Sequence, residues 1–377
     1  MVVDIKYNIL FYCSSNSWGG LELGFLRFAT WMQSRGHTIT CCFVHGTPLY
    51  DGASRAGIPV RAIKRNRKYF DIVNALSVAR IIRDKQFDVV WITDNRDIST
   101  LGWAHWVNRG SFKLLYQQAM QLGIDKKDFF HTARFRRIDA WLAPLQFLAQ
   151  QVKERTRYPS SRVTVVPLAF DPSKFSGAIS RTQARTALNL PASAMVMGVI
   201  GRFDRLKGQH LAIEAFNHLS QEFQHLHLII VGESTRGEGN DYEMELRRRA
   251  KDSEAHNRIN FYPFQENVEG IFNALDIFVL TSQGETFGLV TVEAMACGCA
   301  VVGTNSSGTP ELLGHGQNGL LFEPGNPMQL AEQIRKLLKD EPLRIALQNS
   351  ARRASTKYQK DVVCEAIEAV LHNLLPQ

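Results

Sequence analysis

The sequence predicts two α/β domains, each built on a doubly wound parallel sheet with helices on both faces. The chain has 377 residues, about two to three times the length of a typical domain. Apolar strand-like runs alternate along it with helical periodicity, which is the pattern of βαβ units. This alternation is interrupted once and then starts again, so two such domains follow one another. A content of 45% hydrophobic and 21% charged residues is typical of a folded protein and excludes a disordered chain.

The first half of the chain contains short apolar runs of the kind that form buried parallel strands. We expect these strands at 8–13, 38–44, 88–93, 113–118, 140–143 and 163–168. Apolar residues at helical spacing predict helices over 21–34 and 72–84. Strands that alternate with helices favour right-handed crossovers within one parallel sheet.

The second half repeats this scheme after a polar stretch that begins near residue 170 and ends at Pro191. The predicted strands are 195–201, 226–232, 259–264, 277–281 and 300–303. The predicted helices are 209–219, 241–251, 268–275, 289–296 and 329–339. We therefore expect one domain over 1–173 and a second over 174–360. Ligands of such sheets bind at the carboxyl ends of the strands, so a cleft between the domains is the expected site.

Several classes of protein are disfavoured by composition. No run of 18 apolar residues occurs, so no membrane-spanning helix is predicted. The first residues lack the apolar stretch and cleavage site of a signal peptide. None of the six cysteines forms a CxxC pair, and the CxC pair Cys297 and Cys299 reads as small residues at a tight helix end. We expect a reduced, cytoplasmic protein.

Positive charge is concentrated in the first half of the chain. Residues 1–173 hold 24 Lys and Arg against 13 Asp and Glu, a balance of +11, whereas residues 174–377 hold 20 against 23, a balance of −3. The basic half can meet nucleic acid, anionic lipid or a charged substrate, or it can be a solvated surface. Two stretches, 61–70 and 126–137, interleave cations with aromatic residues.

This interleaving suits the headgroup boundary of an anionic membrane and predicts peripheral binding there, at the inner face. A plain surface helix and a site for an acidic acceptor remain the alternatives. Nucleic acid is not an expected partner, because no helix-turn-helix, zinc or RNP motif is present.

Three segments carry candidate chemistry, and the first is Gly19–Gly20, between the strand at 8–13 and a helix. Glycines at such a turn let backbone N–H groups approach a phosphate at the positive end of the helix. The pattern is not GxGxxG, so a dinucleotide fingerprint is absent. Plain turn geometry explains two glycines equally well.

The second segment contains Arg202 and Lys207, which lie between the strand at 195–201 and the helix at 209–219. Arg presents a planar fork of donors and Lys a mobile point charge, and together they can neutralise a diphosphate. The alternative is a pair of solvated surface charges.

The third segment runs from Glu285 through Gly288 to Glu293, which lies inside an otherwise apolar helix. A buried charge is unfavourable unless it has a partner. Two sugar hydroxyls can both donate to one carboxylate, and the peptide N–H groups at 287–289 point towards an anion. A structural salt bridge is the alternative for Glu293.

At this point the sequence resembles a known family. Residues 285–298, ETFGLVTVEAMACG, closely resemble the signature of glycosyltransferase family 4, in which seven residues separate two glutamates. Residues 201–216, GRFDRLKGQHLAIEAF, are similar to its GR…KG segment. GGLELGFLRFATWMQSRGH (19–37) and SSGTPELLGHGQNGLLFEPGNP (306–327) resemble its first glycine turn and its stretch before the last helices.

The resemblance implies the GT-B fold, with two Rossmann-like domains facing each other across a cleft. It implies that the second domain binds a nucleotide-sugar donor, that the first binds the acceptor, and that the last helix, 361–377, packs back on the first domain. The implied reaction is retaining transfer of a hexose from a UDP- or GDP-sugar to a glycan, lipid-linked or small-molecule acceptor. Alternatives are a weakly active or inactive sugar-nucleotide-binding protein and another GT-B enzyme, such as a nucleotide-sugar epimerase.

The resemblance also implies roles for single residues. Arg202 and Lys207 would hold the diphosphate, Glu293 the ribose hydroxyls and Glu285 the donor sugar, with Phe264 near the base. The implied donor-binding residues are Gly19, Gly20, Arg202, Lys207, Phe264, Glu285, Thr286, Phe287, Gly288, Leu289 and Glu293. The implied catalytic residues are Glu285, Gln118, Lys207 and Arg202.

No cofactor and no metal ion are expected, because Arg, Lys and helix N-termini can neutralise the leaving diphosphate. The metal-binding pattern Asp-x-Asp is absent from the sequence. We interpret Asp94 and Asp97 as loop or acceptor-side polar groups.

One departure concerns a His that many members of the family place near the reacting carbon. Residues 113–120, KLLYQQAM, contain no His. Gln118 can supply a hydrogen bond there, whereas Ala119 cannot. Either another polar group serves the site, with His105 and His131 as candidates, or the activity is reduced, or the chain carries a substitution at this position.

Overall fold

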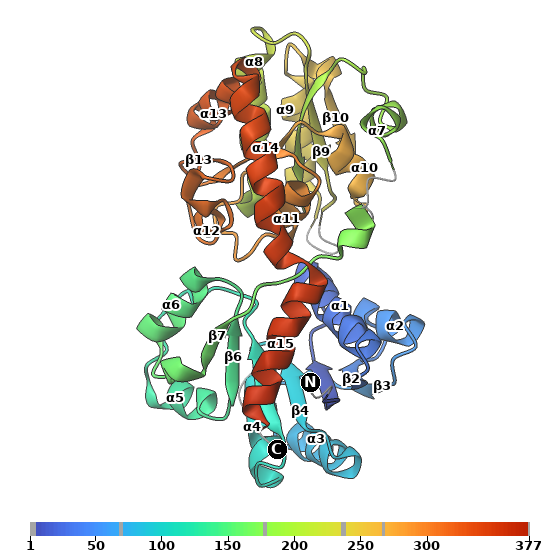
Figure 1. Cartoon of the computed structure of the whole chain (residues 1–377), viewed down its shortest axis with the longest axis vertical. Helices are drawn as coiled ribbons and strands as arrows, with labels where there is room; N and C mark the ends of the chain where they lie inside the picture. Colours follow the sequence, from blue (N-terminus) through green and yellow to red (C-terminus); the bar gives the residue numbers. More distant parts are fainter. Residues whose placement is uncertain (1–4, 68–70, 176–178, 235–238, 266–267, 376–377) are drawn as a thin grey trace. The chain divides into compact units, whose positions relative to one another are not determined.

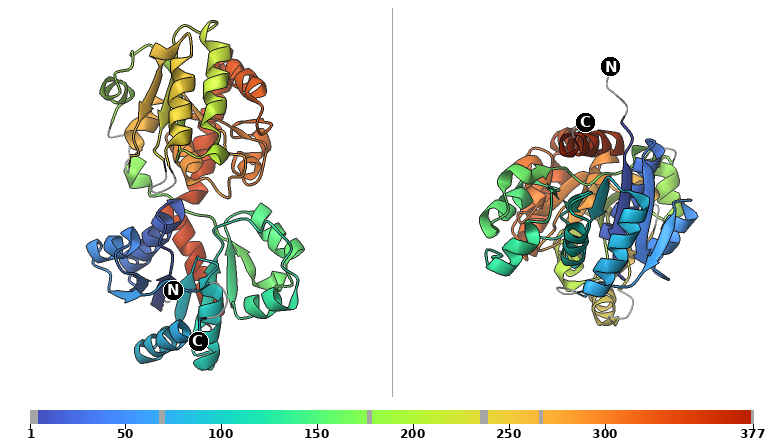
Figure 2. Two further views of the ribbon diagram at one scale, coloured as in Figure 1. Left: turned by 180° about the vertical axis from the view of Figure 1, so that it is seen from behind. Right: turned by 90° about the horizontal axis from the view of Figure 1, so that it is seen from below.

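The computed structural model describes residues 5–67, 71–175, 179–234, 239–265 and 268–375. The chain divides into two compact units, which we describe separately (Figure 1). Unit 1 comprises residues 1–169 and 360–377, and unit 2 comprises residues 170–359. Each unit contains one parallel sheet with helices on both of its faces (Figures 1 and 2). The predicted pair of doubly wound α/β domains is confirmed.

The sheet of unit 1 has seven parallel strands in the order β3-β2-β1-β4-β5-β6-β7. Their bounds are β1 Asn8–Cys13, β2 Thr38–Val44, β3 Val60–Ile63, β4 Val89–Ile92, β5 Lys113–Gln117, β6 Ala140–Ala143 and β7 Val163–Val165. The helices are α1 Gly20–Ser34, α2 Pro48–Arg55, α3 Ile72–Lys85, α4 Asp97–Val107, α5 Phe129–Phe135, α6 Gln146–Arg155 and α15 Lys360–Leu374. Only the first half of the predicted strand at 163–168 is a strand in the structure. Strand β3 was not predicted.

Successive residues of the central strands alternate between two apolar layers. Phe11 packs with α1, α2 and α15 on one face of the sheet, and the next residue, Tyr12, lies on the opposite face with α3, α4 and α6. Burial of apolar surface on both faces is the main stabilising contribution to such a sheet. Glu368 joins α15 to the end of α1 through Arg35, with 2.6 Å between Nη2 and Oε2.

The sheet of unit 2 has six parallel strands in the order β10-β9-β8-β11-β12-β13. Their bounds are β8 Met195–Ile200, β9 Leu226–Val231, β10 Ile259–Tyr262, β11 Ile277–Leu280, β12 Ala300–Thr304 and β13 Leu320–Phe322. The helices are α7 Arg181–Ala187, α8 Gln209–Ser220, α9 Asp241–Lys251, α10 Glu269–Ala274, α11 Leu289–Ala296, α12 Thr309–Leu312, α13 Pro327–Lys339 and α14 Glu341–Ser355.

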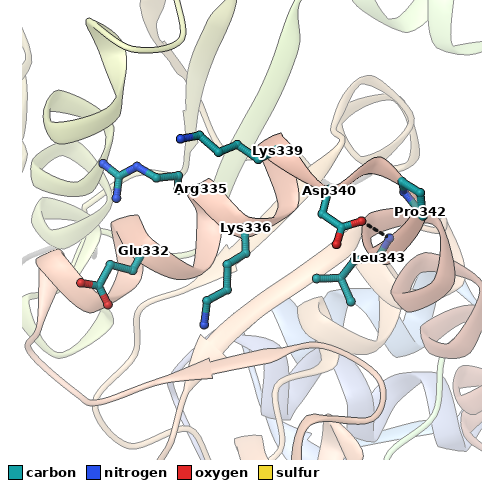
Figure 3. Close-up of a pocket in the computed structure, with 7 residues that line it drawn as sticks. All are labelled: Glu332, Arg335, Lys336, Lys339, Asp340, Pro342 and Leu343. Atoms are coloured by element: carbon teal, nitrogen blue, oxygen red, sulfur yellow. Dashed lines mark hydrogen bonds between the residues drawn. The ribbon is translucent and has the colours of Figure 1, made fainter.

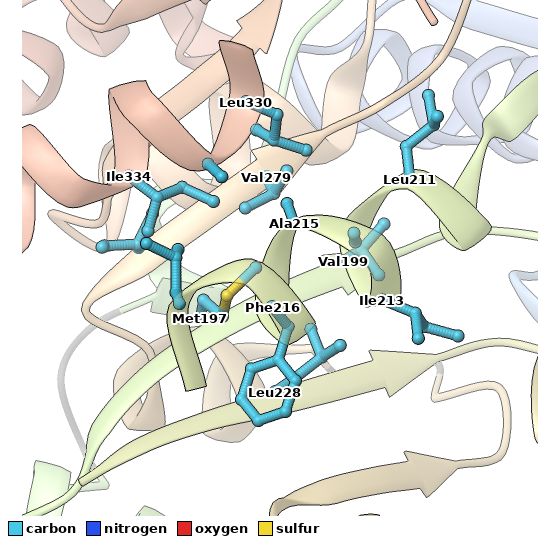
Figure 4. Packing of buried hydrophobic residues seen from close by; sticks show 14 of the residues in the cluster. Met197, Val199, Leu211, Ile213, Ala215, Phe216, Leu228, Val279, Leu330 and Ile334 are labelled. Atoms are coloured by element: carbon cyan, nitrogen blue, oxygen red, sulfur yellow. The ribbon is translucent and has the colours of Figure 1, made fainter. Parts of the chain in front are cut away.

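The core of unit 2 also lies on both faces of its sheet. Figure 4 shows part of one layer, in which Phe216 of α8 and Ile334 of α13 pack with strand residues such as Val279. The opposite layer contains residues of α10, α11 and α14. Both layers hold the strands in place, so the loops at the carboxyl ends of β8, β11 and β12 have fixed starting points.

Within the described residues, every helix is too short or too polar to cross a membrane.

Candidate functional site

Three loops of unit 2 adjoin because β8, β11 and β12 are neighbours in the sheet. We call the loops 201–208, 281–288 and 305–309 the carboxyl edge of unit 2. The backbone N–H of Gln283 donates to the Leu206 carbonyl at 2.9 Å, which joins the first loop to the second. The Gly308 N–H donates to the Glu285 carbonyl at 3.1 Å, which joins the third loop to the second. Parallel sheets bind ligands at this kind of edge.

Lys207 and Glu285 meet at the carboxyl edge although 78 residues separate them in the sequence. Lys207 Nζ lies 2.7 Å from Glu285 Oε2, and their side chains are 34% and 14% exposed. Arg202 is 51% exposed and pairs with Asp204 of its own loop, with 2.9 Å between Nη2 and Oδ2. The structure thus brings three predicted residues to one edge and adds Asp204, which sequence reasoning missed because a short Asp in a turn has an ordinary capping role.

Glycine is required at two positions of this edge. Gly208 has φ +68°, and a Cβ there would lie 2.7 Å from the Thr281 carbonyl oxygen. Gly288 has φ +85°, and a Cβ there would lie 3.0 Å from Glu285 Cγ and 3.2 Å from Thr291 Oγ1. The left-handed backbone at Gly288 starts α11, and its missing side chain leaves room for Glu285 to turn towards Lys207.

Replacing Gly288 by alanine should destabilise unit 2 by roughly 1–2 kcal/mol, since a left-handed conformation is unfavourable by that amount for a residue with a Cβ. The new methyl group should also displace Glu285. Calorimetric unfolding measures the loss, and Gly270→Ala is the matched control, because its Cβ would have its nearest neighbour at 3.8 Å. Equal stability of the two variants would contradict this account of Gly288.

The remaining predicted residues of unit 2 differ in how far their side chains are buried. Glu293 is buried within α11. Phe287 is also buried, with its ring packed edge-on against Tyr358 at a centroid distance of 5.6 Å, so only its backbone is available to a ligand. Thr286 and Leu289 are half-buried beside it. Phe264 is exposed, just after β10.

In unit 1, Gly19 and Gly20 lie where the chain enters α1. Gly19 has φ −169°, an extended conformation that any residue adopts, and a Cβ on Gly20 would have no neighbour within 4 Å. Backbone strain therefore does not explain the two glycines, and their role in binding a phosphate stays a prediction. Glu22 is buried in the first turn of α1 and accepts a hydrogen bond from Ser15 Oγ at 2.9 Å.

Gln118, a predicted catalytic residue, is fully buried in unit 1. Its Oε1 accepts the indole N–H of Trp141 at 3.0 Å, and its Nε2 donates to the Met120 carbonyl at 2.9 Å. These bonds describe a side chain that orders the end of β5. Its catalytic role stays a prediction.

Asp97 is the centre of a buried polar network in unit 1. Its Oδ1 accepts the Ser14 hydroxyl at 2.5 Å and the Asn66 amide at 2.9 Å, and its Oδ2 accepts the Ser14 N–H at 3.1 Å. Burial raises the pKa of Asp97 to about 7, with a smaller contribution from the negative charge of Asp94. The network ties the segment before Gly19 to the start of α4. Sequence reasoning missed this, because a DxxD loop carries no signal of burial.

The two basic stretches lie in unit 1. Residues 126–137 include α5, where Phe129 is 87% exposed. Of the stretch 61–70, the part 68–70 lies outside the described residues.

The candidate replacements for the missing His are both paired with carboxylates. His131 Nδ1 lies 2.6 Å from Asp128 Oδ2, and His105 Nε2 lies 3.7 Å from Asp139 Oδ2.

A hollow of about 710 Å³ lies at the connection of α13 and α14 (Figure 3). Its lining is Glu332, Arg335, Lys336, Lys339, Asp340, Pro342 and Leu343. None of the predicted site residues contributes to it. Arg335 and Lys339 both pair with the carboxylate of Glu222, which compensates one of their two positive charges.

Among the described residues, no group of three or more His, Cys, Asp or Glu side chains could hold a metal ion.

Comparisons with known proteins agree with this architecture. The model of the family "Glycosyltransferase Family 4" matches residues 18–174, and that of "Glycosyl transferases group 1" matches residues 180–354. A glycosyltransferase from Rickettsia africae superposes with a TM-score of 0.87 at 19% identity over 99% of both chains. Anabaena HepE, solved in complex with UDP, superposes with a TM-score of 0.82 at 23% identity over 97% of this chain and 100% of its own.

Curated relatives match over a shorter length. D-inositol 3-phosphate glycosyltransferase of Corynebacterium jeikeium is 32% identical over 220 residues, which are 57% of this chain and 52% of the relative. N-acetyl-alpha-D-glucosaminyl L-malate synthase of Bacillus anthracis is 28% identical over 195 residues, which are 52% of this chain and 49% of the relative. The matches thus span about half the length of these relatives.

The two parallel-sheet units and their structural neighbours place the protein in the GT-B class. The chain belongs to glycosyltransferase family 4.

Proposed function

We propose that the chain is a retaining glycosyltransferase that moves a hexose from a UDP- or GDP-sugar to an acceptor, with unit 2 as the donor side and unit 1 as the acceptor side. The observation that carries the proposal is the meeting of Lys207 and Glu285 at the carboxyl edge of unit 2, within the segments that resemble the family's motifs. The structural neighbour HepE was solved in complex with UDP, which supports a UDP-sugar as the donor. The names of the curated relatives support a small anionic acceptor such as an inositol phosphate or malate.

In this mechanism the bond between the sugar C1 and the diphosphate oxygen breaks while a bond between C1 and the acceptor oxygen forms on the same face. The acceptor proton passes to the departing diphosphate. Arg202 and Lys207 stabilise the negative charge that develops there, as fixed cations do in a site with little water. Glu293 holds the ribose hydroxyls and Glu285 the hydroxyls of the sugar. We propose that these cations act in place of a metal ion.

A thermal-shift panel with UDP, GDP, ADP and CDP tests the donor site. At about 100 times its Kd, the right nucleotide should stabilise the protein by about 2.7 kcal/mol. Lys207→Ala should abolish the shift, and the matched control Lys339→Ala, whose ammonium pairs with Glu222 away from this edge, should keep it. A shift that survives in Lys207→Ala would place the nucleotide elsewhere, and no shift with any of the four would argue against donor binding.

One observation favours the alternative of a weakly active sugar-nucleotide-binding protein. The Gln118 amide, where the family places a His near the reacting carbon, is already hydrogen-bonded to Trp141 and Met120. Product analysis with the selected UDP- or GDP-sugar separates the cases. Transfer yields a glycosylated acceptor, an epimerase yields a changed sugar, and a binding protein yields neither.

We also propose an anionic membrane surface, at the inner face, as a partner of unit 1. Support comes from exposed aromatic side chains within the basic stretch 126–137, namely Phe129 and Phe130 of α5, which are 87% and 38% exposed. Vesicles containing phosphatidylserine should sediment the protein and neutral vesicles should not, because basic segments are attracted to anionic lipid. Phe129→Ala should reduce this binding, and an unchanged fraction in the pellet would contradict the role of α5.

A further inference from the structure

The ion pair between Lys207 and Glu285 occupies the place where a phosphate would bind to the Lys207 ammonium. The Glu285 carboxylate lies 2.7 Å from Lys207 Nζ. The anion position of Lys207 is therefore taken by the protein itself. Arg202 differs, since it is more exposed and its partner Asp204 belongs to the same loop.

The backbones on both sides of this pair are held in place. The Lys207 carbonyl accepts a hydrogen bond from Thr281 Oγ1 at 2.7 Å. The carbonyl of Glu285 accepts the Gly308 N–H at 3.1 Å, and the glycine at 288 leaves space beside Glu285 Cγ. Because these bonds come from three loops, they hold the backbone at both residues and keep the two side chains within reach of each other.

We propose that Glu285 makes this site selective for the complete sugar nucleotide over the bare nucleoside diphosphate. The inference rests on the proposed function and deepens it. A diphosphate that binds Lys207 must displace the carboxylate of Glu285 from its cation. Glu285 is largely buried, so a carboxylate left without a partner there is unfavourable.

The two ligands differ in the hydrogen bonds that they can donate to the displaced carboxylate of Glu285. A sugar nucleotide brings hydroxyl groups that donate to the released carboxylate, so the lost ion pair is replaced by hydrogen bonds. A nucleoside diphosphate or inorganic pyrophosphate brings only more negative charge. The pair therefore weakens binding of the product diphosphate relative to the donor, and it promotes release of the product after transfer.

Calorimetric titration with inorganic pyrophosphate tests the competition without assuming a base. Glu285→Gln keeps the shape of the side chain and removes its charge, so pyrophosphate should bind about fivefold more tightly to this variant than to the wild type. Lys207→Ala should weaken binding. The matched control Glu222→Gln, which removes a carboxylate paired with Arg335 and Lys339 in the same unit, should change nothing.

Titration with UDP and UDP-glucose tests the selectivity. The ratio of the Kd of UDP to that of UDP-glucose should fall in Glu285→Gln, because the variant binds UDP more tightly and loses part of its contact with the sugar. Glu285→Ala should show the same fall, and an unchanged melting transition in both variants verifies that they fold.

The outcomes separate this inference from the proposed function. If the wild type binds these ligands and Glu285→Gln binds pyrophosphate no more tightly, the inference is wrong and the donor site stands. An unchanged ratio for UDP and UDP-glucose overturns the selectivity in the same way. If neither the wild type nor Glu285→Gln binds pyrophosphate or any nucleoside diphosphate of the thermal-shift panel, the inference and the proposed donor site both fail.

Discussion

Replacing Glu293 by alanine should weaken binding of the nucleotide by roughly a hundredfold or more. A hydrogen bond to a charged group contributes about 1.5–3 kcal/mol, so the two bonds of a ribose diol to one carboxylate contribute about 3–6 kcal/mol. Because 1.4 kcal/mol corresponds to a tenfold change, the loss of both bonds gives this factor. Calorimetric titration with the nucleotide selected by thermal shift measures the change.

The alternative for Glu293 is a purely structural role within α11. Glu269→Ala is the matched control, because Glu269 is also buried in unit 2 and lies on α10. We expect the control to bind nucleotide normally and Glu293→Ala to keep a cooperative melting transition. If Glu293→Ala instead loses its melting transition, Glu293 holds the fold and the ribose role is wrong.

The stability of unit 1 should fall as the pH rises from about 4 to about 7. Burial raises the pKa of Asp97 to about 7 in the folded state, whereas an unfolded Asp titrates near 3.9. Between these values the folded state binds more protons than the unfolded state, so each added pH unit lowers the free energy of unfolding. Over the whole window the change is on the order of 4 kcal/mol.

Tryptophan fluorescence can measure this change in unit 1 alone. All six tryptophans lie within residues 18–141, hence in unit 1. Urea unfolding followed by fluorescence at pH 5 and pH 8 gives the two free energies. Asp97→Asn removes the titrating group and should show a much smaller difference between the two pH values. An equally large difference in Asp97→Asn would assign the pH dependence to other groups.

Much of the fold could be predicted because buried strands leave a local signal. The runs at 8–13 and 38–44 coincide with β1 and β2, since apolar residues fill both faces of a central strand. The edge strands β3 and β13 were missed because they have four and three residues and are only partly buried, so their local signal is weak. The edge strands β7 and β10 are equally short, but apolar residues continue past their ends and made the runs at 163–168 and 259–264 visible. Helix α4 was missed for the opposite reason: most of its residues are buried, so it has no single apolar face.

By itself the sequence determined which residue types stand at the turns. Glycines, paired glutamates and a Lys at the ends of predicted strands favoured a phosphate and sugar site, because ligands of parallel sheets bind at the carboxyl ends of the strands. It did not determine which of these residues meet. Lys207 follows β8 and Glu285 follows β11, and these strands are neighbours although β9 and β10 separate them in the chain.

Only the tertiary structure decided such pairings, because the order of strands in a sheet is set by how helices pack on its two faces. The same packing closed Asp97 into a network with Ser14 and Asn66, and it turned Gln118 towards Trp141 in the core. A local pattern records the chemistry of a residue and its distance along the chain. Burial and partnership across the sheet depend on residues far away in the sequence, so they appear only when the chain is folded.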